Sequence, residues 1–186
     1  MQTTKAPSLK ILPLLLSIIV VAGLATFTAC DDSDDDGSKF EGEYKLTSAT
    51  LTTAVTIQGG DMEGTELPVG APITSYVSTS LFSVVQCDNA DNAAIELSGN
   101  TEIHFICLGE TGDTKGGSWT DVDGDLVLQL SSPPFTQNLS ITVTNIEVNG
   151  NTLEGDIDNL PFAGELFGDP GTPVYLVDMH IVFTKQ

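Results

Sequence analysis

Apolar and polar residues alternate with a period of two along most of the chain after residue 39, which is the pattern of strands that bury one face. The clearest alternating runs are residues 40–46, 101–108, 126–130 and 174–185. Clusters of Gly, Pro, Asn and Asp separate these runs at short intervals. We therefore expect an all-β domain of about eight to ten antiparallel strands.

Short segments between the runs have the composition of hairpin turns. They are Ser98-Gly99-Asn100, Asp123-Gly124 and Asn149-Gly150. Before the last of these turns the apolar positions change phase, which predicts a β-bulge near residues 144–145. Residues 74–85 have apolar positions near helical spacing but many β-branched residues, so they fit either a strand or a short helix that closes one end of the domain.

A series of hairpins can close into an up-and-down barrel, which leaves no strand edge exposed, or pack as a two-sheet β-sandwich. The strings Phe40-x-Gly42-x-Tyr44-x-Leu46 and Gly117-Ser118-Trp119, and the apolar final run 177–185, resemble lipocalin-like domains of bacterial surface lipoproteins. In many such domains a Cys and an Asp precede a strand, as Cys87-Asp88 do here, although Trp often stands where this chain has Tyr44. The resemblance covers residues 39–186 and implies a lipocalin-like β-barrel.

The first 29 residues have the three-part order of a secretory signal peptide. Lys5 and Lys10 precede an apolar run at residues 11–24, and small residues lead up to Cys30. The run has about 14 residues, which is short for a helix that must cross about 30 Å of hydrocarbon. We therefore expect residues 1–29 to be a helical signal peptide that is removed from the mature protein.

The string Phe27-Thr28-Ala29-Cys30 resembles the lipobox of bacterial lipoproteins. The small residue Ala29 fits the family pattern, whereas Phe27 stands where Leu is preferred. The resemblance implies cleavage before Cys30, followed by attachment of a diacylglycerol and an acyl group to that cysteine. Several acyl chains together bind a membrane durably, where one chain binds only marginally. An ordinary signal peptide and an uncleaved anchor are the alternatives.

The residues after this cysteine are strongly acidic, with five aspartates in residues 31–38. Such a composition is typical of a solvated, self-repelling tether, here residues 30–38. It also resembles the acidic export tag that directs lipoproteins of one Gram-negative phylum to the outer leaflet of the outer membrane. We expect a protein that is lipid-anchored in the outer membrane and faces the cell exterior. An inward-facing outer-membrane lipoprotein is the alternative.

The charge of the chain excludes one class of partner. The chain has 26 acidic and six basic residues, none of them arginine, for a formal net charge of −20. A chain of this charge does not neutralise phosphates, so we expect no nucleic-acid partner. Anionic lipid headgroups also repel it, so the N-terminal lipid is the expected contact with the membrane.

Cys87 and Cys107 remain once Cys30 is assigned to the lipid. An even pair in an oxidising compartment favours a disulfide. A hairpin centred near residues 99–100 places Cys107 opposite Asn92, so the bridge would tie the loop that enters the hairpin to its far strand. Two buried free thiols are the alternative.

Two groups of residues could carry chemistry, and both have simpler explanations. Residues 121–125 place aspartates at alternate positions, as calcium loops do, but Leu126 stands where the loop needs Gly, and the segment also has the composition of a hairpin turn. His104 and His180, each with an acid two residues away, could act as bases, share a metal ion, or be ordinary strand residues. We expect no catalytic residue, no metal site and no cofactor.

The leading functional hypothesis is a non-enzymatic surface lipoprotein whose barrel binds a small apolar ligand or a glycan. The second is an adhesion or complex-assembly subunit that binds a protein partner through its outer surface or its long loops at residues 59–75 and 161–173. The third is a hydrolase that uses His104 or His180. An open apolar barrel interior favours the first hypothesis, and a filled core with an exposed apolar patch favours the second.

Overall fold

The chain divides into two units, Met1–Asp36 and Gly37–Gln186, and every described residue belongs to the second. The expected signal peptide, Cys30 and the tether as far as residue 37 lie outside the described residues. None of the helices in the described part of the chain has the length and apolar character needed to cross a bilayer. The residues that the computed structural model describes are 38–131, 138–169, 171 and 174–186.

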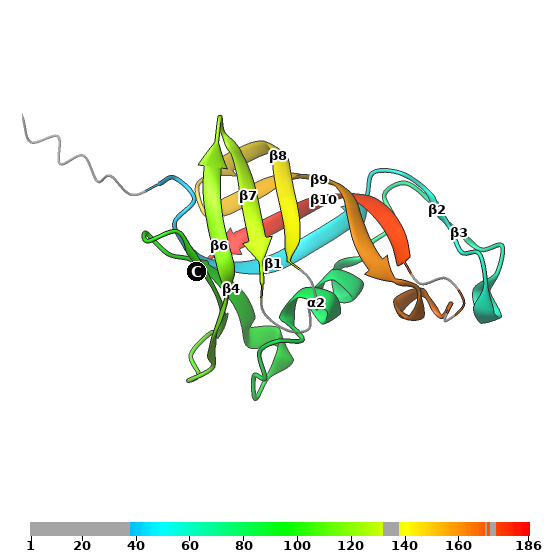
Figure 1. The fold of residues 1–186 in the computed structure, drawn as a ribbon, viewed down its shortest axis with the longest axis horizontal. Coiled ribbons are helices and arrows are strands. Elements are labelled where there is room, and N and C mark those ends of the chain that lie inside the picture. The colour runs from blue at the N-terminus through cyan, green and yellow to red at the C-terminus, as the bar shows by residue number, and fades with distance from the viewer. Residues whose placement is uncertain (1–37, 132–137, 170, 172–173) are drawn as a thin grey trace, which may run out of the picture. The chain divides into compact units, whose positions relative to one another are not determined.

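The long strands form one closed antiparallel barrel in the order β1-β10-β9-β8-β7-β6-β5-β4 (Figure 1). Strands that are neighbours in the sequence pair with one another, and β1 closes the barrel by pairing with both β10 and β4. The barrel strands are β1 (Gly42–Leu51), β4 (Ala93–Leu97), β5 (Glu102–Cys107), β6 (Asp113–Val122), β7 (Asp125–Leu130), β8 (Leu139–Asn149), β9 (Thr152–Ala163) and β10 (Val174–Lys185).

The expectation of an all-β, up-and-down antiparallel barrel is confirmed, and the alternative of a β-sandwich is wrong because the sheet closes on itself. The architecture is compatible with a lipocalin-like fold. Shorter elements lie in the connections between strands. They are β2 (Val55–Thr56), η1 (Gly60–Met62), β3 (Glu66–Leu67), α2 (Thr74–Phe82) and η2 (Ala90–Asn92) between β1 and β4, and η3 (Gly164–Phe167) between β9 and β10.

The barrel forms because alternate residues of each strand are apolar. In β5, for example, Ile103 and Phe105 are fully buried, whereas His104 between them is half-buried on the outer face. The inward side chains form one cluster whose buried members run from Phe40 to Ile181. Residues 38–186 therefore contain the whole packed core of the described chain, and we expect them to fold without the segment that precedes them.

The interior of the barrel is filled by these side chains. The void enclosed by the inward residues of β1, β4, β7, β8, β9 and β10 has only about 20 Å³. Sites for small molecules have volumes of about 300–1,000 Å³. A second apolar pocket of about 160 Å³ lies at the loop end, where Val77 of α2 meets Ile141 of β8 and Leu160 of β9. Both voids are smaller than such sites, so the described part of the barrel interior is a packed core.

One hairpin turn shows why the predicted turn residues are needed. Val122 pairs with Asp125, so Asp123 and Gly124 alone connect β6 to β7. Both have positive φ angles, 56° and 97°. Consecutive positive φ angles characterise the type I′ turn, whose twist matches that of the flanking strands and for which Asp-Gly is a favoured sequence.

Two local predictions concern β8 and residues 74–85. The predicted β-bulge in β8 is confirmed, since the β8–β9 register shifts between Thr144 and Glu147. The ambiguous stretch is a helix, α2, over most of its length. Val77 and Phe82 are its buried residues, and they pack in the core cluster. Burial of this face therefore decides between helix and strand where local composition does not.

The two ends of the barrel differ, as Figure 1 shows. At one end, which we call the hairpin end, the strands are joined by turns at residues 98–101, 123–124 and 150–151, and the described chain both begins and ends there. At the other end, which we call the loop end, lie the longer connections, including residues 52–92, 108–112 and 164–169.

Candidate functional site

A groove opens at the loop end where β1 and β4 separate. The two strands pair only between residues 42–44 of β1 and residues 95–97 of β4. Beyond this point a groove of about 740 Å³ lies between β1, the helix α2, the loop at residues 83–92 and the start of β4. This volume falls in the range of small-molecule sites, about 300–1,000 Å³. The groove is the candidate functional site.

The helix α2 is fixed to the edge of β1 that β4 leaves unpaired. The hydroxyl of Thr74 accepts a hydrogen bond from the amide of Ala49 (2.9 Å). The amide of Ile73 donates to the carbonyl of Ala49 (2.8 Å), and the amide of Leu51 donates to the carbonyl of Ala71 (3.1 Å). These bonds satisfy main-chain groups of β1 and set the position of the helix beside the groove.

The face of α2 that lines the groove carries hydroxyl groups, from Thr74, Ser75, Ser78 and Thr79. The hydroxyl of Thr79 donates to the carbonyl of Ser75 one turn earlier (2.8 Å). The hydroxyls of Ser75 and Ser78 make no hydrogen bond to any described residue. Each hydroxyl can donate one hydrogen bond and accept two, so this face offers several bonds to a ligand.

The other walls of the groove add opposite charges and apolar surface. Lys45 on β1 and Asp91 in η2 carry the charges. Leu46, Phe82 and Val85 line the groove with apolar carbon. A lining that mixes hydroxyls, charges and apolar carbon suits a ligand that is itself polar at its edges and apolar on its faces, such as a sugar ring.

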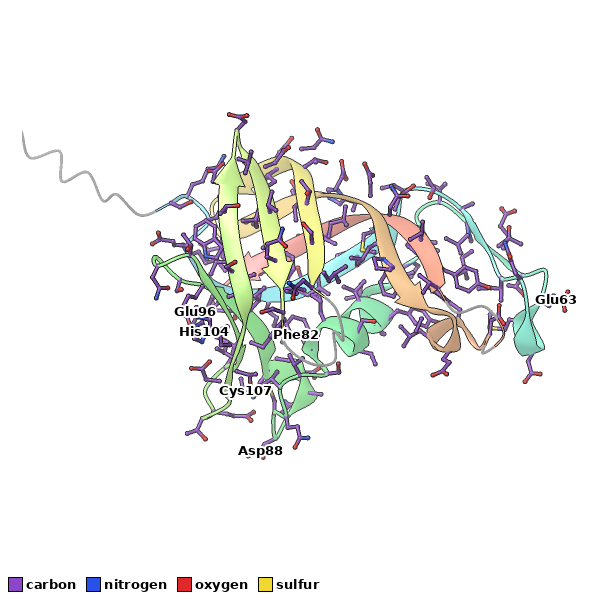
Figure 2. All side chains as sticks on the ribbon, viewed as in Figure 1. Glu63, Phe82, Asp88, Glu96, His104 and Cys107 are labelled. Carbon is purple, nitrogen blue, oxygen red and sulfur yellow. A yellow bond between two sulfur atoms is a disulfide. The ribbon has the colours of Figure 1, made fainter. Side chains whose placement is uncertain are left out.

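A disulfide holds the loop at residues 83–92 that forms the outer wall. It joins Cys87, which lines the groove, to Cys107 at the end of β5 (Figure 2). Cys107 pairs with Ala93, and the amide of the next residue donates to the carbonyl of Asn92 (2.8 Å). The bridge therefore ties the loop that enters the hairpin to the far strand. The residue opposite Cys107 is Ala93, one position after the expected Asn92.

Glu110 holds the same loop through hydrogen bonds. Its carboxylate accepts bonds from the amide of Asp88 (2.6 Å), the amide of Asn89 (3.3 Å) and the side-chain amide of Asn92 (2.7 Å). These bonds, that from Asn92 first, lower the pKa of Glu110 because they favour its charged form. Two attachments, one covalent and one polar, thus fix the outer wall of the groove.

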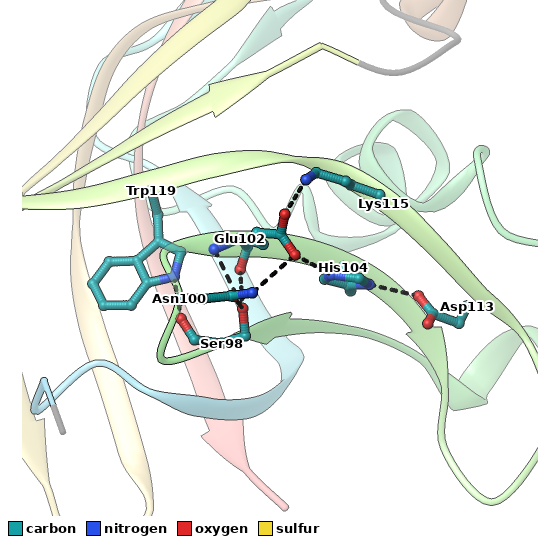
Figure 3. Close-up of polar contacts among 7 residues, drawn as sticks. All are labelled: Ser98, Asn100, Glu102, His104, Asp113, Lys115 and Trp119. Carbon is teal, nitrogen blue, oxygen red and sulfur yellow. Dashed lines mark hydrogen bonds and ion pairs between the residues drawn. The ribbon is translucent and has the colours of Figure 1, made fainter.

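His104 belongs to a charged network on the outer face of β5 and β6 (Figure 3). Its Nδ1 lies 2.8 Å from Oδ1 of Asp113, and its Nε2 lies 3.5 Å from Oε2 of Glu102, which also pairs with Lys115. Asp113, and to a lesser extent Glu102, raises the pKa of His104. The network lowers the pKa of Glu102, chiefly through Lys115. The charged side chains of this network therefore stabilise one another on the barrel surface.

The two histidines do not converge. His104 lies on β5 and His180 on β10, and β4 and β1 lie between these strands in the sheet. Through strand pairing, His104 lies level with Glu43 of β1, whereas His180 lies opposite Thr50 of β1. These two residues of β1 are about 23 Å apart at the usual rise along a strand. The hypothesis that the two histidines share a metal ion or a substrate is therefore wrong.

Residues 121–125 form the β6–β7 hairpin and not a calcium loop. The carboxylate of Asp121 accepts a hydrogen bond from the amide of Gly124 (2.9 Å), so the turn itself uses that group. Among the described residues, the one group of His, Cys, Asp or Glu atoms close enough to hold a metal ion is Cys87, Cys107 and Glu110. The disulfide occupies both sulfurs of this group.

Sequence reasoning did not find the groove, although one signal for it is present. Thr74, Ser75, Ser78 and Thr79 follow the spacing that places side chains on one face of a helix. This spacing predicts a shared hydroxyl face only if the segment is helical, and the composition of the segment alone does not establish that it is. The second wall depends on where β1 and β4 separate, which no local pattern encodes.

Comparison with known proteins adds no assignment to this geometry. The chain matches no profile of a known protein family, no curated protein and no solved structure.

Proposed function

We propose that the chain is a lipid-anchored, cell-surface lipoprotein of the outer membrane that binds a glycan, without catalysis, in the groove between α2, β1 and β4. One contrast carries the proposal. The voids among the described core residues have about 20 and 160 Å³, whereas the groove outside the barrel has about 740 Å³ and a hydroxyl-rich wall. The lipocalin-like barrel then acts as a rigid support, and its outer groove acts as the site.

The contrast separates the two ligands that the sequence left open. A small apolar ligand needs an enclosed apolar cavity of about 300–1,000 Å³ that removes its surface from water. The two voids among the described core residues, about 20 and 160 Å³, are smaller than that. A glycan needs hydrogen-bond donors and acceptors beside patches of apolar carbon, and the hydroxyls of Ser75 and Ser78 lie beside Phe82 and Val85 in the groove. Glycan binding is therefore the function that the geometry supports best.

The position of the groove agrees with an anchor on Cys30. The described chain begins at the hairpin end, where the amide of Glu41 donates to the carbonyl of Ser38 (2.9 Å). The groove lies at the loop end, so the first described residue, Ser38, is at the opposite end of the barrel from the site. A lipid-anchored protein of this kind can hold its groove open to ligands outside the cell.

Lipid attachment is tested in cells that express the full chain, labelled with an alkyne analogue of palmitate. We expect label on the wild-type protein and none on a Cys30→Ala variant, because the thiol is the acceptor of the diacylglycerol. Protease added to intact cells should degrade the labelled protein if it faces outward. Label that persists in Cys30→Ala contradicts the anchor, and protection from protease contradicts the outward orientation.

Glycan binding is tested with residues 38–186 on an array of neutral and acidic oligosaccharides, followed by calorimetry with the strongest hit. Ser78→Trp should fill part of the groove and weaken the affinity by about tenfold or more, about 1.4 kcal/mol. Thr142→Trp, on the exposed outer face of β8, is the matched control and should leave the affinity unchanged. Binding of no oligosaccharide, or equal loss in both variants, contradicts the proposal.

A further inference from the structure

The strands β9 and β10 continue past their other neighbours at the loop end. β10 pairs with β1 only as far as Met179, opposite Leu51, and β9 pairs with β8 only as far as Ile157. From there to Val174 and Ala163 the two strands pair with each other alone. This two-stranded extension, residues 159–163 and 174–177, leaves the barrel wall as a ribbon (Figure 1).

One edge of this ribbon has main-chain groups without a strand partner. The carbonyl of Asp178 accepts a hydrogen bond from the amide of Thr52 (3.0 Å), so this carbonyl points away from β9. Main-chain groups of alternate residues in a strand point to the same side, so those of Val174 and Leu176 also point away from β9. In the described ranges no strand pairs with β10 on that side beyond Met179.

The outer face of the ribbon is apolar as well. Leu176 is 63 % exposed and Val174 is 50 % exposed. Pro161 and Ala163, which stand opposite them on β9, are exposed too. An unpaired strand edge beside exposed aliphatic side chains is a template for a further strand, and proteins usually block such an edge with Lys, Pro or a covering segment. The connection that follows β1 touches β10 at Asp178, through Thr53, and at the hydroxyl of Tyr175, through Gln58. Within the described ranges no hydrogen bond from this connection reaches the main chain of Val174 or Leu176.

We infer that the ribbon edge at residues 174–177 binds an extended, basic segment of a partner protein, which adds to β10 as a further strand. Strand addition supplies main-chain hydrogen bonds, and alternate side chains of the added segment contact the exposed apolar face. The inference goes beyond the proposed glycan site, which lies between β1, α2 and β4 and shares no lining residue with the ribbon, and neither depends on the other.

Charge identifies the kind of partner. Asp158 and Glu165, both exposed, lie in or beside the strands of the ribbon, and Asp178 lies next to its edge. The whole chain has a formal net charge of −20. A second copy of this chain would bring the same negative charge to the edge, so self-association is disfavoured. A segment with basic residues between apolar ones fits both the charge and the exposed face.

The probes are synthetic peptides of about eight residues, a usual strand length. The first alternates Lys and Val, the second has the same composition with a central Pro, and the third has Glu in place of Lys. Amide hydrogen exchange on residues 38–186 should slow at Val174 and Leu176 when the first peptide is added. The second and third peptides should bind at least about tenfold more weakly, because they lack a donor or carry the wrong charge.

A pair of variants then locates the contact. Leu176→Lys places a charge on the edge and should weaken binding of the Lys-Val peptide by about tenfold or more. Val148→Lys, on β8 near the hairpin end, changes an exposed valine in the same way and should have no effect. Equal affinity in Leu176→Lys, slow exchange at Leu176 before any peptide is added, or dimers that Leu176→Lys disrupts would each overturn the inference.

Discussion

The two ends of this barrel are built in different ways, although the same strands run through both. The hairpin end uses short turns whose backbone conformation is fixed by residue type, as at Asp123 and Gly124. The loop end uses long connections that are held by side chains, as in the Cys87–Cys107 disulfide. Short turns leave little surface that can vary, whereas long connections on a rigid frame can form a site.

A buried carboxylate shows how far the loop end depends on side chains. Asp169 is fully buried, and the hydroxyl of Tyr175 donates to it (2.7 Å). The same hydroxyl accepts a hydrogen bond from the amide of Gln58 (2.8 Å), which lies in the connection after β1. The buried carboxylate and hydroxyl link the two loops, and the loss of either hydrogen bond would leave a buried polar group without a partner, which is costly. Stability at the loop end therefore rests on specific pairs of residues.

The largest expected effect comes from removing the disulfide. A Cys87→Ser, Cys107→Ser double variant of residues 38–186 should lose about 3 kcal/mol of unfolding free energy, since the bridge closes a loop of about 20 residues in the unfolded chain. Denaturant titration measures this loss. Glycan affinity should fall as well, because the outer wall of the groove is released. Unchanged glycan affinity in a variant that is still folded contradicts the role of this wall.

A substitution at the hairpin end should affect stability and leave binding alone. Gly124→Val forces a β-branched residue to a φ of 97° and should cost about 1–3 kcal/mol of unfolding free energy. Val122→Ala, at an exposed position of the same hairpin, is the control and should change stability by less than about 0.5 kcal/mol. If Gly124→Val weakens glycan binding at a temperature where it is fully folded, the two ends are not independent.

A smaller effect is expected from His104, whose pKa is raised chiefly by Asp113. A raised pKa in the folded state means that the stabilisation is complete below the unfolded pKa, about 6.5, and is lost as the pH rises through the folded pKa. Asp113→Asn should lower the pKa of His104 in an NMR titration. It should also reduce stability at pH 5 by about 0.5 kcal/mol and have little effect at pH 9. A loss that is equal at both pH values would indicate a role other than the charge pair.

The smallest expected effect is local to the outer wall of the groove. Glu110→Gln should speed amide exchange at Asp88 and Asn89, because a neutral amide oxygen accepts weaker bonds than a carboxylate. The lowered pKa of Glu110 means that the wild-type contribution is present above the unfolded pKa and is lost as the pH falls through the folded pKa. Wild-type exchange should therefore approach that of the variant in acid. No difference between them at neutral pH contradicts the role of Glu110.

Local patterns predict the hairpin end well and the loop end only in part. Asp123-Gly124 and the phase change near residue 144 are local signals, and the structure has the turn and the bulge. The segment at 74–85 has no decisive pattern, and it becomes a helix because Val77 and Phe82 are buried by distant strands. The hypothesis of a site shared by His104 and His180 was wrong because the distance between the two residues depends on strand order, which two short motifs do not encode.

The groove and the ribbon edge could not be predicted from local patterns either. The groove exists because β1 and β4 stop pairing after Tyr44, and the edge exists because β1 stops pairing with β10 at Leu51. Both are consequences of register between strands that lie far apart in the sequence. The nature of the lining residues is visible in the sequence, but their position in space is not.

We propose that this barrel binds its ligand outside its core, at the loop end. This proposal is tested most directly by NMR of labelled residues 38–186, titrated with the strongest oligosaccharide from the array. We expect the largest shift changes at residues that line the groove, namely Lys45, Thr74, Ser75, Ser78, Thr79, Gln86, Ala90 and Asp91. Largest changes at inward core residues such as Leu128, or at the turn at residues 123–124, would contradict it.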